Sequence, residues 1–279
     1  MKRFLSLILI FFWSWPLVSV QKSPISTLFV HGLGSNSTQA LFYAEDHTAM
    51  CSNVHCSINR PTNWHILKKP VYSFDFPHVH NKPHKQYVSL AQDIEIAALK
   101  EACDALPGPK ILMGVSMGAS TIINYASLYY TPDIKALIAE TPFDEVESIL
   151  KSILGFTYEG LKNLAHSWIY PLYNPNGIKP LFAIQKLSKE LPILLVHAST
   201  DELIPLQCSR HLYYHLRQNG HQHVYLLELS SGKHANYIFA KDAQKYQETV
   251  HAFYKKYKLP HDEVLAQLGE KHLAEAHAW

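Results

Sequence analysis

The sequence has almost no net charge, because its 279 residues include 25 Lys and Arg against 23 Asp and Glu. A balance so close to neutral lacks the basic footprint expected of a nucleic-acid-binding protein. Charged residues make up 17% of the chain and hydrophobic residues 47%, a composition that excludes a disordered chain and allows a sizeable core. The length suits one α/β domain or two small ones.

Cysteine is also scarce, and the chain has only Cys51, Cys56, Cys103 and Cys208. Neither their spacing nor their neighbours suggest a zinc site, and we predict no metal. In an oxidising compartment Cys51 and Cys56 could close a small disulfide loop, and free, partly buried thiols are an equally good alternative.

The sequence lacks an apolar run long enough for an ordinary membrane span. The run at the N-terminus, Phe4–Trp13, follows Lys2 and Arg3, and the whole segment offers about fifteen apolar residues against the roughly 20 that a span needs. This pattern predicts a signal peptide over residues 1–20 with cleavage near Gln21, and therefore a secreted or periplasmic protein. The alternatives are an uncleaved N-terminal membrane anchor, which a mature N-terminus at Met1 would indicate, and a buried segment.

Six short apolar segments alternate with helix-compatible segments along the chain. We predict strands at Ser26–Val30, Val71–Phe74, Ile111–Gly114, Ile134–Ala139, Pro192–Ala198 and Val224–Leu229. We predict helices near Thr38–His47, Ser89–Ala105, Ala119–Leu128, Pro180–Ser188 and Ala235–Lys258. The predicted helix Ser89–Ala105 should have an apolar face made of Leu90, Ile94, Ala97 and Ala98. Regular alternation of strands and helices favours a parallel sheet covered by helices on both faces.

The connection between the fourth and fifth predicted strands is about fifty residues long, which is more than a simple crossover between parallel strands needs. Apolar residues follow helical spacing there, which predicts a small helical cap over about residues 144–177. These residues are Val146, Ile149, Leu150, Ile153, Leu161, Leu164, Ala165 and Trp168. The main domain would span residues 21–258. Residues 259–279 form an amphipathic extension whose predicted apolar face is Val264, Leu265, Leu268 and Leu273; it could pack on the core, mediate a dimer or touch a membrane.

The third predicted strand leads directly into Gly114-Val-Ser116-Met-Gly118, followed by a predicted helix. This Gly-x-Ser-x-Gly pattern is typical of a serine on a tight strand-to-helix turn, with its hydroxyl exposed at the carboxyl end of a sheet. Such a turn strains the serine backbone, and the small flanking residues keep the neighbouring strand and helix uncrowded. Ser116 is therefore the candidate nucleophile.

A serine nucleophile needs a base and a group that orients the base, and both can be found at later strand ends. His234 follows the sixth predicted strand in Gly232-Lys-His234, and Asp201 follows the fifth. Carboxyl ends of parallel strands meet at one edge of a sheet, so the three side chains should lie close together. The alternatives for the acid are Glu202 and Asp144, with Asp201 acting as a helix N-cap.

The segment His31-Gly32-Leu33-Gly34 ends the first predicted strand. Its glycines let backbone amides approach a substrate, so we assign the Leu33 and Met117 N–H groups as donors to a developing oxyanion. We expect His31 to stabilise this loop rather than to act as a base.

Together these pieces resemble the α/β-hydrolase fold superfamily, nearest to its prolyl-oligopeptidase-like and serine-aminopeptidase-like branches. The matching pieces, in the family's order, are His31-Gly32, Phe74-Asp75, Gly114–Gly118, Glu140-Thr-Pro-Phe143, Pro192–Asp201 with Ile204-Pro205, and Gly232-Lys-His234. The resemblance implies an α/β-hydrolase fold, with a mostly parallel sheet of about six strands flanked by helices and a small cap after the fourth strand. The chain departs from the family in having His197-Ala198 in place of His-Gly, and in having no counterpart of the family's two N-terminal antiparallel strands before Ser26.

The resemblance and the residues imply a serine hydrolase that cleaves a carboxylic ester or thioester through an acyl-enzyme, without a cofactor. Its substrate would be a small-molecule or lipid-like acyl compound, which could bring the protein near a membrane. A serine peptidase or amidase is the alternative, in which Glu140 or Glu159 would hold a peptide amine. A non-catalytic binding protein on the same fold is a further alternative.

Two other groups of residues bear on the site. We assign substrate-binding positions to His31, Gly32, Phe143 and Trp168, and Tyr170 and Tyr173 could also line an acyl pocket. The His-rich segment 77–84 could suggest a metal site, with His78 and His80 pointing the same way on an extended chain and His84 completing the set. No carboxylate or cysteine accompanies them, so we predict a solvated loop instead.

Overall fold

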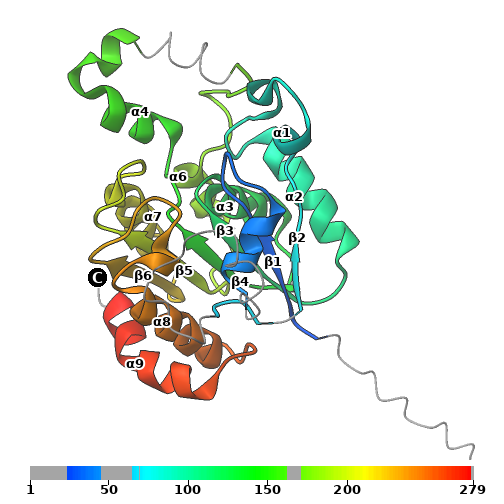
Figure 1. Ribbon diagram of the computed structural model, residues 1–279, viewed down its shortest axis with the longest axis vertical. Coiled ribbons are helices and arrows are strands. Elements are labelled where there is room, and N and C mark those ends of the chain that lie inside the picture. The colour runs from blue at the N-terminus through cyan, green and yellow to red at the C-terminus, as the bar shows by residue number, and fades with distance from the viewer. Residues whose placement is uncertain (1–23, 45–64, 69, 162–170, 278–279) are drawn as a thin grey trace, which may run out of the picture.

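Six parallel strands form the centre of the molecule in the order β2-β1-β3-β4-β5-β6 (Figure 1). The computed structural model describes residues 24–44, 65–68, 70–161 and 171–277. The strands are β1 (Ser26–Val30), β2 (Val71–Ser73), β3 (Lys110–Val115), β4 (Ile134–Glu140), β5 (Ile193–Ala198) and β6 (Val224–Leu229). Every neighbouring pair is parallel, as the alternation of segments predicts.

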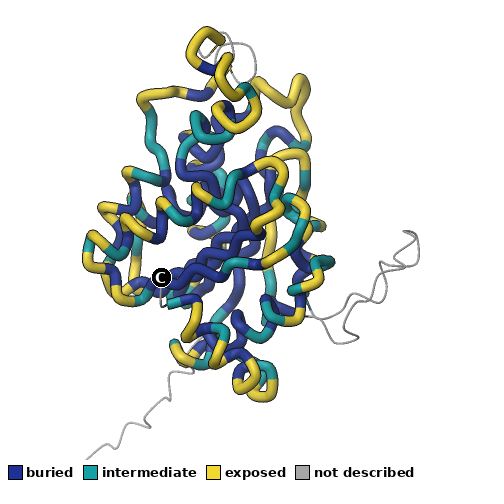
Figure 2. Tube along the Cα trace, turned by 90° about the vertical axis from the view of Figure 1, so that its left-hand side faces the viewer, coloured by how far each residue is buried: buried dark blue, intermediate teal, exposed yellow. Residues whose placement is uncertain are grey.

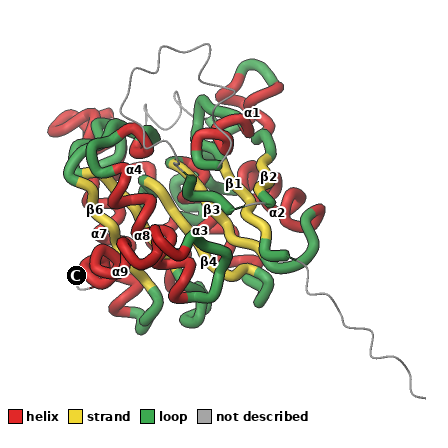
Figure 3. The backbone as a smooth tube through the Cα atoms, turned by 60° about the horizontal axis from the view of Figure 1, so that its bottom comes forward, coloured by secondary structure: helices red, strands yellow, loops and turns green. Residues whose placement is uncertain are grey.

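Helices cover both faces of the sheet (Figure 3). The α-helices are α1 (Pro77–His80), α2 (Asp93–Ala105), α3 (Met117–Tyr129), α4 (Val146–Leu154), α6 (Pro180–Ala183), α7 (Leu206–Gln218), α8 (Ala243–Lys256) and α9 (Glu263–His277). The 3₁₀-helices are η1 (Ser37–Phe42), η3 (His84–Tyr87), η4 (Gly155–Thr157), η5 (Ile184–Lys186) and η6 (Tyr237–Phe239). Within the described residues, no helix has the length and apolar character that a membrane crossing requires.

The apolar side chains form two cores, one on each face of the sheet. Leu112 of β3 faces the core built with α2, α3 and α7, whereas its neighbours Ile111 and Met113 face the core built with α8 and α9. This alternation follows from the period of two in a β-strand. The central strands are buried on both faces and run through the middle of Figure 2, which explains why they read as continuous apolar runs.

The helix predicted at Ser89–Ala105 starts later, at Asp93. Leu90 and Ala91 have positive φ angles of 56° and 65°, which a helix does not allow, and the Ser89 hydroxyl accepts the Ile94 N–H. The predicted apolar face of this helix is correct only in part. Leu90 is buried ahead of the helix and Ala98 packs against the core, but Ala97 is exposed. The buried apolar residues of α2 are Ile96, Leu99 and Cys103.

Other boundaries differ for similar local reasons. The helix predicted from Ala235 begins at Ala243, because Ala235 has a φ of 53° and the chain makes the 3₁₀ turn η6 before it becomes helical. The predicted helix at Pro180–Ser188 consists of α6 and η5, and the one near Thr38–His47 is the 3₁₀-helix η1.

The described part of the predicted cap contains α4 and η4, which lie at the top of Figure 1. Val146 and Leu150 on one face of α4 are buried, as the helical spacing predicts. Trp168 and Tyr170, with Leu164 and Ala165, lie outside the described residues. The predicted signal peptide, Cys51 and Cys56 do so as well, while Cys103 and Cys208 are free and buried.

The C-terminal helix α9 packs against α8 and β6. Its predicted apolar face is wrong apart from Leu273, since Val264 and Leu268 are 67% and 55% exposed. The buried face is made mainly of small residues, Ala266, Gly269 and Ala276, and a Cβ added to Gly269 would collide with the backbone of α8. Close approach of two helices selects small side chains at the contact, and hydropathy spacing does not detect them.

Candidate active site

The turn between β3 and α3 places Ser116 at the carboxyl edge of the sheet. Ser116 has φ 55° and ψ −120°, a conformation that a non-glycine residue adopts only at a cost. The surrounding structure holds it there: its N–H donates to the carbonyl of Glu140 on β4 at 2.9 Å, and α3 begins at the next residue.

The two glycines of the motif are required by packing. A Cβ added to Gly114 would collide with the backbone of Gly118 and Ala119. A Cβ added to Gly118 would collide with the carbonyl groups of Val30 and His31 at the end of β1. The motif therefore brings the start of α3 into direct backbone contact with the neighbouring strand, as the sequence pattern predicts.

The structure brings Ser116, His234 and Asp201 into one chain of hydrogen bonds. The Ser116 Oγ lies 2.9 Å from His234 Nε2, and His234 Nδ1 lies 3.0 Å and 3.1 Å from the two carboxylate oxygens of Asp201. The Asp201 side chain is fully buried and that of His234 is 15% exposed. Such a chain has the geometry for transfer of the serine proton to the imidazole, with the carboxylate fixing the ring.

Four further donors hold the Asp201 carboxylate. It accepts hydrogen bonds from the hydroxyls of Thr141 at 2.8 Å and Tyr237 at 2.5 Å, and from the N–H groups of Leu203 and Ile204, both at 3.0 Å. Burial alone would raise the pKa of Asp201. Hydrogen bonding to His234 and the charge of that ring outweigh burial and, with Tyr237 and Ile204, hold the pKa below its usual range.

The two alternative acids occupy other positions. Glu202 accepts the backbone N–H of His234 at 3.2 Å rather than a ring N–H. Asp144 lies at the base of the cap, where its carboxylate is 2.9 Å from His211. Asp201 is therefore the carboxylate that faces the imidazole ring.

The loop after β1 is rigidly held by His31, which is completely buried. His31 Nδ1–H donates to the Gly32 carbonyl at 2.8 Å and Nε2 accepts the Phe76 N–H at 3.1 Å, so both ring nitrogens are used to hold the loop. Burial lowers the pKa of His31, against the raising effects of the Gly32 carbonyl and Asp75. In the described part of the chain, the N–H groups of Leu33 and Met117 have no hydrogen-bond acceptor.

An apolar cavity of about 270 Å³ opens onto Ser116 and His234. Apolar and aromatic residues from several segments line it: Leu33, Leu90, Met117, Phe143, Val146, Ile149, Leu150, Ile153, Tyr173, Leu203 and Ile204. The face of α4 that the sequence predicts as apolar forms one wall. Of the predicted substrate-binding residues, Phe143 lines the cavity and Trp168 is outside the described residues. The Tyr173 hydroxyl donates to Glu147 at 3.0 Å.

Glu140 is not available to hold a peptide amine. It is fully buried, and its two carboxylate oxygens accept hydrogen bonds from Tyr43 and Tyr246. Glu159 is exposed on the cap and does not line the cavity. Three residues next to the site support it. The Glu140 carbonyl accepts the Ser116 N–H, and Thr141 and Tyr237 donate to Asp201. The sequence did not predict these roles, and its only signal was the position of Glu140 and Thr141 at a strand end.

The His-rich segment is helical rather than extended, since α1 spans Pro77–His80. His78 points into the core, whereas His80 lies 2.9 Å from Asp75 and His84 lies 2.5 Å from the His78 carbonyl oxygen. The three rings therefore have separate surroundings. Across the described residues, no group of His, Cys, Asp and Glu is arranged to hold a metal.

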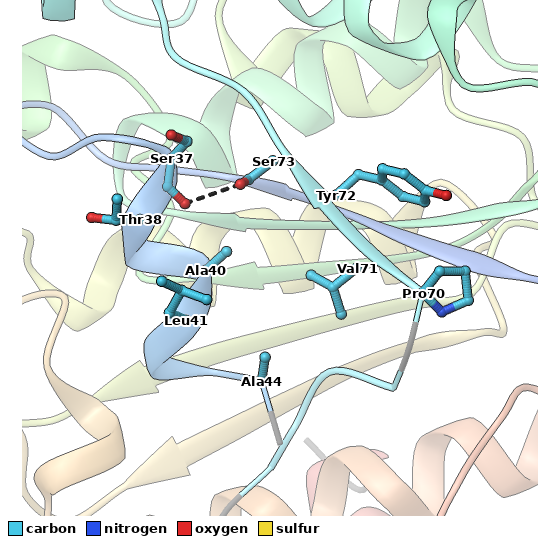
Figure 4. A pocket seen from close by; sticks show the side chains of 9 residues that line it. All are labelled: Ser37, Thr38, Ala40, Leu41, Ala44, Pro70, Val71, Tyr72 and Ser73. Carbon is cyan, nitrogen blue, oxygen red and sulfur yellow. Dashed lines mark hydrogen bonds between the residues drawn. The ribbon is translucent and has the colours of Figure 1, made fainter. Parts of the chain in front are cut away.

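A second hollow, of about 630 Å³, lies between η1 and the edge strand β2 (Figure 4). Its polar side chains are Ser37, Thr38, Tyr72 and Ser73, and the Ser73 hydroxyl donates to the Ser37 carbonyl at 3.0 Å. Among the described residues that line it there is no histidine, lysine or arginine. The cavity at Ser116 is therefore the candidate active site.

Comparison with known protein sequences does not assign this chain to a family. No protein family model matches the chain. The uncharacterized protein YqkD of Bacillus subtilis is 28% identical over 151 residues, which are 50% of this chain and 46% of that protein. The match thus spans about half the length of the relative.

Solved structures are more informative. An esterase of Pyrococcus furiosus superposes with a TM-score of 0.55 and 18% identity, over 84% of this chain and 83% of the esterase. An acylaminoacyl peptidase of Pyrococcus horikoshii gives a TM-score of 0.55 at 16% identity, over 89% of this chain but 39% of the peptidase. A monoacylglycerol lipase of Paleococcus ferrophilus gives 0.52 at 17% identity, over 84% and 96%. At such identities the likeness establishes the fold alone, and it confirms the predicted fold class.

We expect Gly118→Ala to destabilise the protein by about 1–3 kcal/mol, because the new methyl group would push α3 away from β1. Gly160→Ala is the matched control, since a Cβ there meets no atom within 4 Å. Urea unfolding of the two variants checks the prediction. Equal stabilities would contradict the close packing at the turn.

Proposed function

We propose that this chain, which has the α/β-hydrolase fold, is a serine hydrolase that cleaves a carboxylic ester or thioester through an acyl-enzyme intermediate. The observation that carries the proposal is the hydrogen-bonded chain from Ser116 through His234 to Asp201 at the mouth of an apolar cavity. The turn strain at Ser116 and the burial of Asp201 both cost stability. A protein that only binds a partner would have no use for a strained serine turn and a buried carboxylate that lower its stability.

In the proposed reaction, the Ser116 Oγ attacks the substrate carbonyl carbon while His234 Nε2 takes the hydroxyl proton. Asp201 keeps Nδ1–H oriented and stabilises the imidazolium that forms. The N–H groups of Leu33 and Met117 stabilise the oxyanion of the tetrahedral intermediate. His234 then returns the proton to the departing alcohol or thiol, which leaves the acyl group on Ser116.

The second half of the reaction repeats these roles with water. His234 removes a proton from a water molecule, which attacks the acyl carbon; the collapse of the second tetrahedral intermediate returns the proton to Ser116 Oγ and releases the carboxylic acid. The residues themselves supply every proton transfer, so the proposal involves no cofactor.

The cavity favours an unsubstituted medium or long acyl chain over a peptide. Among the described residues that line it there is no Asp, Glu, Lys or Arg, so an α-amino group there would be desolvated without a carboxylate partner from them. Two of the structural relatives are named an esterase and a lipase, which agrees with this choice. The peptidase is matched over only 39% of its length, so this chain does not correspond to the whole of that protein.

Ser116→Ala should abolish labelling by a fluorophosphonate probe, because the probe forms its bond with an activated serine hydroxyl. Ser152→Ala, on the exposed face of α4, is the matched control and should label at the wild-type rate. In-gel fluorescence measures both. A wild-type protein that does not label, or a Ser116→Ala variant that labels as well as wild type, would refute the proposal.

Ile149 lines the cavity, so Ile149→Trp should fill part of it and shift the preference of the enzyme to short acyl chains. We expect kcat/KM for p-nitrophenyl octanoate to fall by about tenfold or more, with a change of less than about threefold for the acetate. Ser152→Trp places the same ring on the other side of α4 and should leave the preference unchanged. Aminoacyl and peptidyl anilides run alongside decide between ester and amide, and a clear preference for an anilide would overturn the ester assignment.

A further inference from the structure

Gln92 is a buried glutamine just before α2 that the proposed reaction does not use. It occupies the N-cap position of α2, where a short polar side chain usually accepts an N–H of the first turn. The Gln92 side chain makes no such bond, and the residue is only 3% exposed. The Ser89 hydroxyl accepts the Ile94 N–H instead, so the first turn of α2 does not depend on the Gln92 amide.

The Gln92 amide binds the end of the predicted cap. Its Nε2–H groups donate to the Asn174 carbonyl at 2.9 Å and to the Ile178 carbonyl at 3.1 Å, and its Oε1 accepts the Asn174 N–H at 2.9 Å. The two bonds with Asn174 resemble the pair that two opposite residues exchange in an antiparallel ladder. Because all three partners are backbone groups, the amide fixes the path of the chain over residues 174–178.

Gly177 leaves room for this amide. A Cβ added to Gly177 would lie 2.7 Å from Nε2 and 3.0 Å from Cδ of Gln92, which is closer than non-bonded atoms pack. Gly177 is not among the glycines with a positive φ angle, so its backbone conformation does not call for glycine. The amide of Gln92 is therefore the physical reason for a glycine at this position.

The two residues before the glutamine are held in an unfavourable conformation. Leu90 and Ala91 have φ angles of 56° and 65°, which cost free energy in residues other than glycine. Side chains hold this turn: Glu95 accepts the N–H and the hydroxyl of Ser89 at 3.1 Å and 2.6 Å, and the Asn124 amide donates to the Ala91 carbonyl at 2.8 Å. The turn places Leu90 in the lining of the cavity at the candidate active site.

Tyr173, which precedes Asn174, also lines the cavity and is 8% exposed. Its hydroxyl donates to Glu147 of α4 at 3.0 Å, and Lys179 Nζ lies 3.0 Å from the same carboxylate. Tyr173 is thus held at its hydroxyl by α4. Its backbone is held through the next residue by Gln92.

We propose that Gln92 is a positioning residue that sets the acyl-chain selectivity of the site: its amide clamps the end of the cap at Asn174, joins Leu90 and Tyr173 into one fixed cavity wall, and so preorganises the cavity for a long acyl chain. This inference rests on the proposed serine hydrolase function. Gln92 does not itself line the cavity, and it acts through Leu90 and Tyr173.

The physical basis is the cost of ordering a wall when substrate binds. Each methylene group of a long acyl chain contributes binding free energy by contact with a wall that is already in place. When the wall is loose, binding has to order it, and that cost is subtracted from the free energy of binding. A short acyl group touches less of the wall. Loss of the clamp should therefore reduce activity on long chains more than on short ones.

The test is the ratio of kcat/KM for p-nitrophenyl octanoate to kcat/KM for the acetate, measured for wild type and Gln92→Met. Methionine has a similar length and volume and can make none of the three hydrogen bonds. We expect the ratio to fall by about fivefold or more, because the long chain loses contacts with a fixed wall.

Gln247→Met is the matched control. Gln247 is 1% exposed and donates to the His65 carbonyl at 3.2 Å, so the variant also removes a hydrogen bond from a buried glutamine to the backbone. It belongs to α8, which packs in the core on the opposite face of the sheet from Tyr173. Gln247→Met should keep the wild-type ratio, whatever its effect on stability.

The outcomes separate this inference from the proposed function. A wild-type protein that neither labels with a fluorophosphonate nor hydrolyses either ester refutes the proposed function itself. An active Gln92→Met protein with the wild-type ratio would overturn the role of Gln92 while leaving Ser116 as the proposed nucleophile. Equal falls of the ratio in Gln92→Met and Gln247→Met would indicate a general loosening of the protein and would also overturn the inference.

Gly177→Ala provides a second variant if Gln92→Met does not fold. Its methyl group would displace the end of the flexible Gln92 side chain, so it should break the clamp while the fold is kept. The ratio should fall in the same direction as in Gln92→Met. Gly160→Ala, where a Cβ meets no atom within 4 Å, should keep the wild-type ratio. An unchanged ratio in a folded Gly177→Ala protein would contradict the proposed role.

Discussion

The structure of the site depends on the backbone contact between the turn at Ser116 and the end of β1. Glycine at positions 114 and 118 allows α3 to start directly against the carbonyl groups of Val30 and His31. This contact places a strained serine beside the loop that carries the Leu33 amide, with His31 bracing the loop from below. The proposed nucleophile and the proposed oxyanion donors therefore share one rigid unit, which meets the need of acyl transfer for preorganised groups.

The remaining parts of the site are attached to this unit by hydrogen bonds from neighbouring strand ends. The Glu140 carbonyl fixes the Ser116 backbone, and the Thr141 hydroxyl fixes Asp201, which in turn orients His234. Two buried carboxylates thus belong to this network. Asp201 accepts a hydrogen bond from Tyr237, and Glu140 accepts hydrogen bonds from Tyr43 and Tyr246. Satisfied polar networks of this kind are rigid, and they allow buried carboxylates to lie next to an apolar cavity.

The sequence was sufficient to predict Ser116, Asp201 and His234 together, because each follows a β-rich run and the ends of parallel strands converge. It was not sufficient for Glu140, since only the fold brings Tyr43 and Tyr246 to the same carboxylate. Local backbone geometry was also invisible: positive φ angles at Leu90 and Ala91 delay α2. In α9, small residues rather than large apolar ones make the contact with α8, so hydropathy spacing selected the wrong face.

The most direct test of the central claim is the mass of the protein during turnover. Wild-type protein quenched in acid within the first turnovers of a p-nitrophenyl ester should carry one additional acyl group, on the peptide that contains Ser116. Release of p-nitrophenol should show a burst that corresponds to one equivalent of protein. Turnover with the acyl group on another residue, or turnover that persists undiminished in Ser116→Ala, would contradict the account.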